Sequence, residues 1–376
     1  MGPLNILHVF RAPVGGLFRH VADLARAQIA RGHRVGLITD RRTGGSRAEE
    51  ILGALAPSLA LGLSRVSMRR HMAPSDLLVL AHVMRRIGNG KVDVVHGHGS
   101  KGGAFARLAL NGRAAIRAYT PHGGSLLFRE GSVAGCIYHG AERILMRRCD
   151  LYLFESAFSA DTFSRKVGTP LALTRVVHNG VPPEEFEPVP LRAEATDLIF
   201  IGELRLLKGV DLLIEAIALL RDRGRAVTAT LVGDGPDRET FRAQVARLRL
   251  QEAIRFPGAM PARKAQSFGC VMVVPSRAES LPYVVLEAAA SGKPMVATRV
   301  GGIPEIYGSL SGNLVPPENS TALAETICRT LDDIPAAEAA ARALRERIST
   351  AFTLDSMTDG VLAAYRDALA VRAGTA

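Results

Sequence analysis

The strongest constraint on the fold is an alternation of short apolar runs with amphipathic helical patterns along the 376-residue chain. The first run, Asn5–Phe10, predicts a buried strand, and the pattern over Phe18–Ala30 predicts a helix that ends before Gly32. The other strands expected in the first half are Arg34–Thr39, Val92–Val95, Ile116–Tyr119, Leu151–Phe154 and Arg175–Val177. Such alternation is typical of a doubly wound parallel sheet.

A proline-rich stretch, Pro182–Pro190, interrupts this pattern and is a candidate linker. The alternation then resumes, with helical patterns that include Val210–Arg223 and Pro282–Ser291. The strands expected here are Leu198–Ile201, Thr228–Val232, Ile254–Phe256, Val271–Val274, Met295–Thr298 and Asn313–Val315. We therefore predict an α/β protein with two Rossmann-like domains, residues 1–185 and 191–354, which face a cleft. The tail is expected to end in a further helix, Met357–Val371.

The positive charge is confined to the first half of the chain. Lys and Arg outnumber Asp and Glu by 47 to 36, and residues 1–190 alone hold 25 basic and 14 acidic side chains, which accounts for the whole net charge of +11. Such a half requires an acidic partner, namely nucleic acid, an anionic lipid surface or a phosphorylated substrate. Nucleic acid is disfavoured, because aromatic residues make up 5% of the chain and no nucleic-acid-binding motif is present.

The densest basic cluster lies among apolar residues and has two interpretations. It is either a solvated loop or a segment that rests on an anionic membrane surface. The cluster consists of Arg65, Arg69, Arg70 and His71 beside Leu63, Val66 and Met68. The N-terminus has no secretory-signal pattern, and the four cysteines have no metal-binding spacing. We expect a cytoplasmic protein, with peripheral contact to the inner membrane face left open.

Two carboxylates, Glu279 and Glu287, flank the predicted start of a helix. Pro282 suits the first turn, so Glu279 is expected in the preceding loop and Glu287 inside the helix. Backbone N–H groups over residues 280–283, which include Ser280 and Leu281, form a natural cradle for a diphosphate. Glu287 lies among apolar residues, where a carboxylate requires hydroxyls or a cation as partners. A ribose diol would serve, although a helix with one exposed glutamate at its edge is as good an interpretation of Glu287 alone.

The segment Gly202–Gly209 places two cations, Arg205 and Lys208, on a loop between a strand and a helix. Cations there could neutralise a leaving diphosphate. The alternative is two surface cations near a helix N-terminus, a position that the helix dipole slightly disfavours.

Four further loop residues are weaker candidates. Gly16 and Gly233 follow strands, where glycine allows a ligand to approach the backbone, but either residue can simply form a turn. His98 and His122 are expected on neighbouring strand ends and suit acceptor binding or proton transfer. No DxD, HExxH or Cys/His grouping indicates a catalytic metal.

In combination these motifs resemble the retaining glycosyltransferases of family 4, which have the GT-B fold. The similarity rests on Glu279–Glu287, Gly202–Gly209, Gly233-Asp234-Gly235, the segment Val300–Glu305 and Gly15-Gly16, in that family's order along the chain. It implies a nucleotide-sugar bound by the second domain and an acceptor bound mainly by the first. It also implies that the final helix, within 355–376, packs back on the first domain. From the missing metal-binding motifs, no metal or other cofactor is expected.

The resemblance also implies roles for single residues. Glu279 would contact the hydroxyls of the donor sugar, Glu287 the ribose and Lys208 the diphosphate. Gly16 would lie against the donor and His122 beside the transferred sugar. The family commonly has arginine directly after the glycine that ends the strand. Here Glu203 takes that place, so Arg205 is expected to supply the second cation.

The resulting expectation is a retaining hexosyltransferase that moves a sugar from a UDP- or GDP-linked donor to a glycan or lipid-linked acceptor. Synthesis of cell-surface polysaccharide or lipopolysaccharide is the expected setting. One alternative is another GT-B enzyme, such as a nucleotide-sugar epimerase or a soluble sucrose- or trehalose-type synthase. The other is a non-catalytic protein of this fold that binds an anionic surface or nucleic acid.

Overall fold

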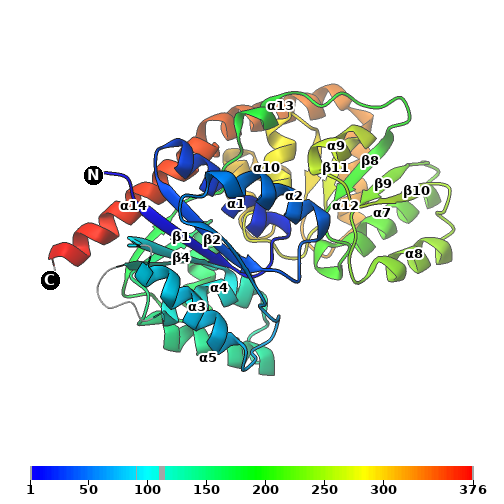
Figure 1. The fold of residues 1–376 in the computed structure, drawn as a ribbon. Helices are drawn as coiled ribbons and strands as arrows, with labels where there is room; N and C mark the ends of the chain where they lie inside the picture. Colours follow the sequence, from blue (N-terminus) through cyan, green and yellow to red (C-terminus); the bar gives the residue numbers. More distant parts are fainter. Residues whose placement is uncertain (1, 90, 110–114, 375–376) are drawn as a thin grey trace. The chain divides into compact units, whose positions relative to one another are not determined.

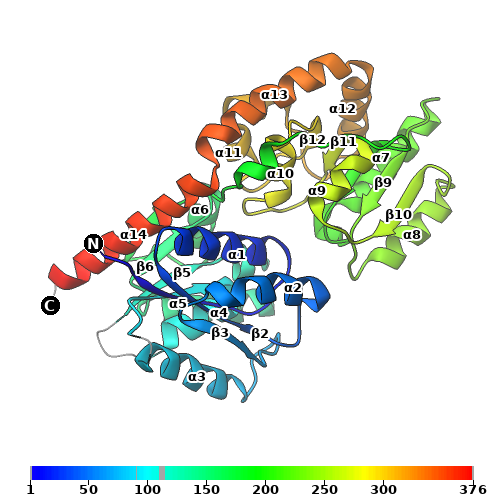
Figure 2. The same ribbon diagram turned by 45° about the horizontal axis from the view of Figure 1, so that its top comes forward.

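The computed structural model describes residues 2–89, 91–109 and 115–374, which form two compact α/β units. Unit 1 contains the described residues of Met1–Asn179 and Leu354–Ala376, and unit 2 is Gly180–Thr353. The chain thus returns to unit 1 at its end. Figures 1 and 2 show the two units with their helices and strands labelled.

Unit 1 is built on a seven-stranded parallel sheet with the order β3-β2-β1-β4-β5-β6-β7. Its strands are β1 (Asn5–Phe10), β2 (Arg34–Asp40), β3 (Gly62–Val66), β4 (Val94–His98), β5 (Ile116–Thr120), β6 (Leu151–Phe154) and β7 (Leu173–Val176). Its helices are α1 (Gly15–Ala30), α2 (Gly45–Leu55), α3 (Asp76–Asn89), α4 (Gly99–Leu108), α5 (Val133–Met146), α6 (Ala157–Lys166) and α14 (Leu354–Gly374).

The two faces of this sheet are covered by different helices. On β1, Ile6 packs in one cluster with α14, whereas Leu7 and Val9 pack with α3 and α4 on the other face. Alternate residues of a strand point to opposite faces, so His8 shares the face of Ile6. The same alternation on β4 puts His96 and His98 on the face of Val94, which also packs with α14. Three histidines of the central strands are therefore directed to the side that α1 and α14 cover.

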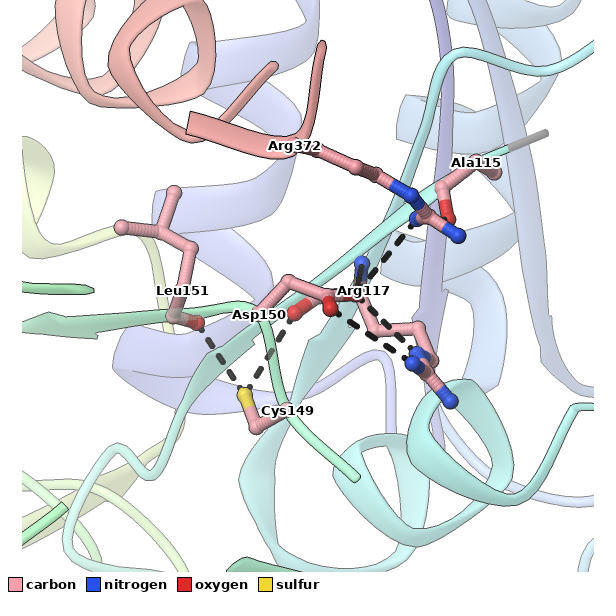
Figure 3. A network of polar contacts seen from close by, with 6 residues as sticks. All are labelled: Ala115, Arg117, Cys149, Asp150, Leu151 and Arg372. Carbon is pink, nitrogen blue, oxygen red and sulfur yellow. Dashed lines mark hydrogen bonds and ion pairs between the residues drawn. The ribbon is translucent and has the colours of Figure 1, made fainter. Parts of the chain in front are cut away.

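The C-terminal helix α14 is held to unit 1 by apolar packing and by a polar network at its end. Met357, Val361 and Tyr365 are buried against the sheet. Near the end of the helix, Arg372 donates a hydrogen bond to the carbonyl of Ala115 and lies 3.8 Å from the carboxylate of Asp150. That carboxylate also accepts bonds from the backbone and side chain of Arg117 (Figure 3).

Unit 2 contains a five-stranded parallel sheet with the order β10-β9-β8-β11-β12. Its strands are β8 (Thr196–Ile201), β9 (Ala229–Val232), β10 (Ile254–Gly258), β11 (Gly269–Val274) and β12 (Met295–Ala297). Its helices are α7 (Val210–Asp222), α8 (Arg238–Arg247), α9 (Ala262–Ala265), α10 (Tyr283–Ala290), α11 (Ile303–Tyr307), α12 (Ser320–Asp332) and α13 (Ile334–Ala351). Apolar clusters on both faces of the sheet, one with α7 and α12 and the other with α10 and α13, form the core.

Four local expectations are wrong. The segment Asn313–Val315 is not a strand, since only Val315 forms an isolated bridge. The pair Gly15-Gly16 lies in the first turn of α1 rather than in a loop before it. His98 ends β4 rather than lying on a loop, because β4 begins at Val94 and extends to it. Unit 1 also has an additional strand, β3.

The basic cluster near β3 is only partly at the surface. Arg65 lies on β3 and pairs with Glu49 at 2.7 Å, while Met68 is buried. Arg65 and Met68 therefore do not belong to an exposed loop. Arg69 and Arg70 are exposed, as is Met72 just beyond them.

Candidate active site

An ion pair at the carboxyl end of the unit 2 sheet joins two of the expected site residues. The ammonium of Lys208 donates to both carboxylate oxygens of Glu279, at 2.7 and 2.9 Å. The hydroxyl of Ser276 donates to Oε1 of the same carboxylate at 2.7 Å. Glu279 is 9% exposed and the Lys208 side chain 26%. This arrangement is a partly buried charge pair with the ammonium on its more open side.

A second ion pair fixes the two loops that carry these residues. Lys208 ends a short 3-10 turn, Leu206–Lys208, between β8 and α7, while Glu279 lies between β11 and α10. Arg277, two residues before Glu279, makes a two-point contact with Asp211 on α7, with both distances 2.7 Å. The Arg277 guanidinium also donates to the carbonyl of Leu206. Planar two-point pairs of this kind constrain geometry as well as adding energy, so Arg277 is a positioning residue for both loops.

Glycine is required where a third loop passes under Glu279. Gly301 has φ +56°, and a Cβ there would lie 1.8 Å from the carbonyl oxygen of Glu279. Gly233, after β9, has φ +152° and would bring a Cβ equally close to the carbonyl oxygen of Gly202. Any larger residue would displace the backbone at these strand ends. The glycines therefore allow the loops at this edge of the sheet to pack against one another.

Helix α10 begins directly beyond Glu279 and carries Glu287. Pro282 is its N-cap residue and has no N–H, so the backbone donors within residues 280–283 belong to Ser280, Leu281 and Tyr283. The expectation that Pro282 lies in the first turn is wrong, because it lies just outside that turn. Glu287 is 5% exposed among buried alanines. A carboxylate at that depth requires polar partners.

The Arg205 side chain does not take part in the ion pair of Lys208 and Glu279. Its side chain is 45% exposed, and its nearest acidic group is Glu203 at 3.9 Å. At that distance and exposure the pair is weak. Arg205 is free to change direction, whereas Lys208 is fixed on the carboxylate.

Unit 1 presents a different arrangement, a group of five histidines at the carboxyl ends of its central strands. His98 and His122, the expected pair, are linked through Nδ1 of His98 and Nε2 of His122 at 3.0 Å. His98 Nε2 in turn lies 2.9 Å from Nδ1 of His8, whose Nε2 lies 2.8 Å from Oε1 of Gln28. His96 and His20 complete the group, and their rings lie 3.9 and 5.6 Å from that of His98.

Burial lowers the pKa of every histidine in this group. Removal from water disfavours the imidazolium, so the pKa values of His8 and His20 fall to about 4. Burial, followed by repulsion from neighbouring histidines, lowers the pKa values of His96, His98 and His122 well below their usual range. At neutral pH the group consists of uncharged imidazoles, each with one N–H donor and one lone pair.

Sequence reasoning identified some of these residues and missed others. Ser276, Arg277 and three of the histidines were missed. Ser276 and Arg277 share the segment of Glu279, and a polar run directly after a buried strand was the available signal. For His8 and His96 the signal was a histidine inside an otherwise apolar strand. Gly16 lies in the first turn of α1, the helix that also carries His20.

Two α/β units, each built on a parallel sheet and with the end of the chain returning to the first unit, are the architecture of the GT-B glycosyltransferases. Residues 14–185 match the family described as Glycosyltransferase Family 4, and residues 195–333 match Glycosyl transferases group 1. Together the two matches cover most of the chain, which belongs to the group 1, or family 4, glycosyltransferases. The predicted family and fold are thereby confirmed.

Similar proteins span nearly the full chain. A glycogen synthase of Mycobacterium tuberculosis (strain CDC 1551 / Oshkosh) is 28% identical over 94% of this chain and 91% of its own length. A D-inositol 3-phosphate glycosyltransferase of Acidothermus cellulolyticus is 28% identical over 95% of this chain and 87% of its own. Among solved structures, Anabaena Alr3699/HepE in complex with UDP and glucose has a TM-score of 0.81 at 21% identity, with 97% of this chain and 100% of that chain covered. No helix among the described residues is long and apolar enough to cross a membrane.

Proposed function

We propose that the protein transfers a hexose from a nucleotide-sugar, with UDP as the favoured nucleotide and GDP as the second choice, and with retention of anomeric configuration. The observation that carries this proposal is the Lys208–Glu279–Ser276 group, which lies beside a helix that carries a buried Glu287. Alr3699/HepE has this fold and was solved with UDP and glucose, which supports a uridine donor.

Each donor group would have its own partner in unit 2. Glu279 would accept hydrogen bonds from the sugar hydroxyls, while Glu287 would accept them from the ribose diol. The Lys208 ammonium has three N–H donors, and two of them go to Glu279. The third is directed away from the carboxylate and would bind a diphosphate oxygen. Gly233 and the amides of Ser280 and Leu281 would line the same region.

Stabilisation of the leaving diphosphate is the principal catalytic task in this proposal. Fixed positive groups act strongly where negative charge develops in the transition state. Lys208 would supply the fixed charge, and Arg205 would turn from Glu203 to supply the second. Because these cations and the amides neutralise the diphosphate, the transfer would proceed without a metal ion. The departing phosphate oxygen would take the proton of the acceptor hydroxyl as the new glycosidic bond forms and the sugar–phosphate bond breaks.

Unit 1 would bind the acceptor, with His122 and Gly16 on the side of the transferred sugar. The excess of positive charge in residues 1–190 favours an anionic acceptor, and the A. cellulolyticus relative is named for a phosphorylated one. We propose a glycan or lipid-linked acceptor of cell-surface polysaccharide or lipopolysaccharide synthesis. The alternatives, a nucleotide-sugar epimerase or a surface-binding protein without catalysis, leave the charged donor group or the histidines unused.

Exposed apolar residues on two helices of unit 1, α3 and α5, support a lipid-linked acceptor. Helices α3, α4 and α5 lie along one face of the sheet (Figure 1). Leu77 and Leu78 on α3 are 71% and 75% exposed, and Ile144 on α5 is 75% exposed. Arg147 and Arg148, directly after α5, are also exposed. Exposed apolar side chains and exposed arginines suit the interface of an anionic membrane, which would make the protein a peripheral one at the inner membrane face.

The first test is a thermal-shift screen of the full chain against UDP, GDP, ADP and their common sugars, with and without EDTA. We expect one nucleotide to raise the melting temperature by the same amount with and without EDTA, and we expect this shift to be lost in Glu287→Ala. Glu325→Ala, an exposed change on α12, is the matched control. If no nucleotide shifts a well-folded sample, the donor site is wrong, and salt-sensitive binding to anionic vesicles or DNA would favour the non-catalytic alternative.

A further inference from the structure

The histidines of unit 1 contain a group of three imidazoles with the geometry of a metal site. His20, His98 and His122 each place one ring nitrogen within 4.8 Å of the other two. Nδ1 of His98 and Nε2 of His122 are 3.0 Å apart. Two nitrogens on a tetrahedral zinc ion, at about 2.0–2.1 Å each, lie roughly 3.3 Å apart. This spacing is close to the observed one, so a turn of the two rings that directs both nitrogens to a common point would admit the ion.

A chain of hydrogen bonds determines which ring nitrogen of His98 carries the lone pair. Oε1 of Gln28 is an acceptor, so Nε2 of His8 carries the proton and Nδ1 of His8 has the lone pair. That lone pair accepts from Nε2 of His98, which leaves Nδ1 of His98 as a lone pair facing His122. Metal-binding histidines characteristically hold their second nitrogen in such an outer hydrogen bond.

His20 is oriented by the same principle. Its Nδ1 lies 2.9 Å from Oδ1 of Asn179, an acceptor, so Nδ1 carries the proton and Nε2 is the lone pair. The ring of His20 meets that of His122 edge-on, with centroids 4.7 Å apart. Two of the three rings thus have an outer partner that fixes the tautomer required for a metal ligand.

His122 closes the group through an uncommon backbone conformation. It has φ +51°, in the left-handed region that few residues other than glycine adopt. Outliers of this kind are often found at functional sites. In the metal-free protein, Nε2 of His122 donates to His98, and metal binding moves that proton to Nδ1. His122 is also less buried than its partners, which gives an ion a route of entry.

We propose that His20, His98 and His122 bind one divalent transition-metal ion of the borderline class, such as Zn²⁺, with a solvent molecule as the fourth ligand. Imidazole nitrogens suit Zn²⁺, Co²⁺, Ni²⁺ and Cu²⁺, whereas Mg²⁺ prefers oxygen. The proposal concerns unit 1 alone and does not depend on how the donor diphosphate is neutralised.

A second trio, His8, His96 and His98, also lies within 4.8 Å but is the poorer site. Both nitrogens of His96 already have partners, Tyr365 at 2.6 Å and Thr120 at 2.9 Å. Both nitrogens of His8 are likewise occupied. A metal there would break bonds of His8 and His96 to residues outside the trio, which is costly, whereas in the first trio only the bond between His98 and His122 is exchanged for the metal.

The test is a Co²⁺ titration of the full chain after removal of metals with a chelating resin. We expect the visible d–d bands of a four-coordinate ion to saturate at one equivalent and to disappear on addition of Zn²⁺, but to persist with excess Mg²⁺. His20→Gln should abolish these bands. His71→Gln, a change of an exposed histidine of unit 1, should leave them unchanged.

A measurement on the unmodified protein covers the case in which His20→Gln fails to fold. With imidazole nitrogens labelled with ¹⁵N, Zn²⁺ should shift the ring resonances of three histidines strongly. Gln28→Glu, which places an acceptor-only carboxylate at the end of the hydrogen-bond chain, should tighten binding about tenfold. The proposal is overturned if the folded protein gives no Co²⁺ bands, or if folded His20→Gln keeps them.

Discussion

Both units place their candidate site residues at the carboxyl ends of parallel strands, but the interactions that hold these side chains in position differ between the units. Unit 2 uses charge, with Lys208 and Glu279 paired and Arg277 locked on Asp211. Unit 1 uses uncharged imidazoles whose hydrogen bonds run from ring to ring. The ammonium of a charged pair can bind a phosphate oxygen directly, whereas a neutral imidazole can donate a hydrogen bond, accept one or bind a metal. The difference matches a donor on unit 2 and a hydroxyl acceptor on unit 1.

The largest expected effect that would test this contrast is acid destabilisation of unit 1. His8 and His20 have pKa values of about 4 in the folded chain, against 6.5 when unfolded. The unfolded state therefore binds more protons between pH 6.5 and 4, and stability falls as pH falls through that window. Each of the two contributes about 1.4 kcal/mol per pH unit there, and the stability is fully present above pH 7.

Urea unfolding of the full chain at pH 7.5, 6 and 5, followed by pulse proteolysis with fragment identification, would measure this loss. Fragments of unit 1 should appear at lower urea as the pH falls, with a smaller change for unit 2. His8→Gln should reduce the pH dependence, and His71→Gln is the matched control. Equal acid sensitivity of the two units would contradict the contrast.

The next effect is on turnover. Lys208→Met removes the fixed cation, and loss of one preorganised donor to a developing oxyanion typically costs about 10²–10³ in kcat. Lys208→Arg should recover part of the loss, because it keeps the charge but changes its geometry. Lys264→Met, at an exposed site of the same unit, should retain full activity. Steady-state transfer assays with circular dichroism as the folding check are sufficient, and near-wild-type turnover of Lys208→Met would remove the cation from the mechanism.

A smaller effect separates donor binding from acceptor binding. Glu287→Gln should raise the KM for the nucleotide-sugar about 10- to 100-fold, since hydrogen bonds to a charged group contribute roughly 1.5–3 kcal/mol. The KM for the acceptor should change little. Glu325→Gln is the control, and both values come from initial-rate kinetics. Equal changes in the two KM values would mean that Glu287 acts through the fold of α10 rather than on the ribose.

Much of the fold could be predicted because the alternation pattern depends on local sequence. Asn5–Phe10 and Leu151–Phe154 match the observed strands to the residue, since a buried parallel strand is a continuous apolar run. The strand β3, Gly62–Val66, was missed because its residues are all only partly buried and include Ser64 and Arg65. An edge strand of mixed polarity resembles a loop in sequence.

The candidate site was predictable only where its residues cluster in sequence. Glu279 and Glu287 lie eight positions apart on one turn and helix, so a local pattern exposed them. His8, His20 and His122 come from a strand, a helix and a loop far apart in the chain. Only the parallel register, which sets His8 opposite His96, brings the strands' histidines together. Clusters built by register rather than by spacing leave little local signal.

The smallest expected effect concerns Arg205 and Glu203, the pair that departs from the family pattern. At 3.9 Å and about half exposed, their attraction is worth at most about 1 kcal/mol. If Arg205 leaves Glu203 to reach the diphosphate, Glu203→Gln should lower the donor KM by up to about fivefold, and Arg205→Ala should raise it less than tenfold. Both changes should shrink at high salt, which screens exposed charges. A Glu203→Gln effect that persists in Arg205→Ala would show that the two side chains act independently, and would contradict the proposed movement of Arg205 from Glu203 to the diphosphate.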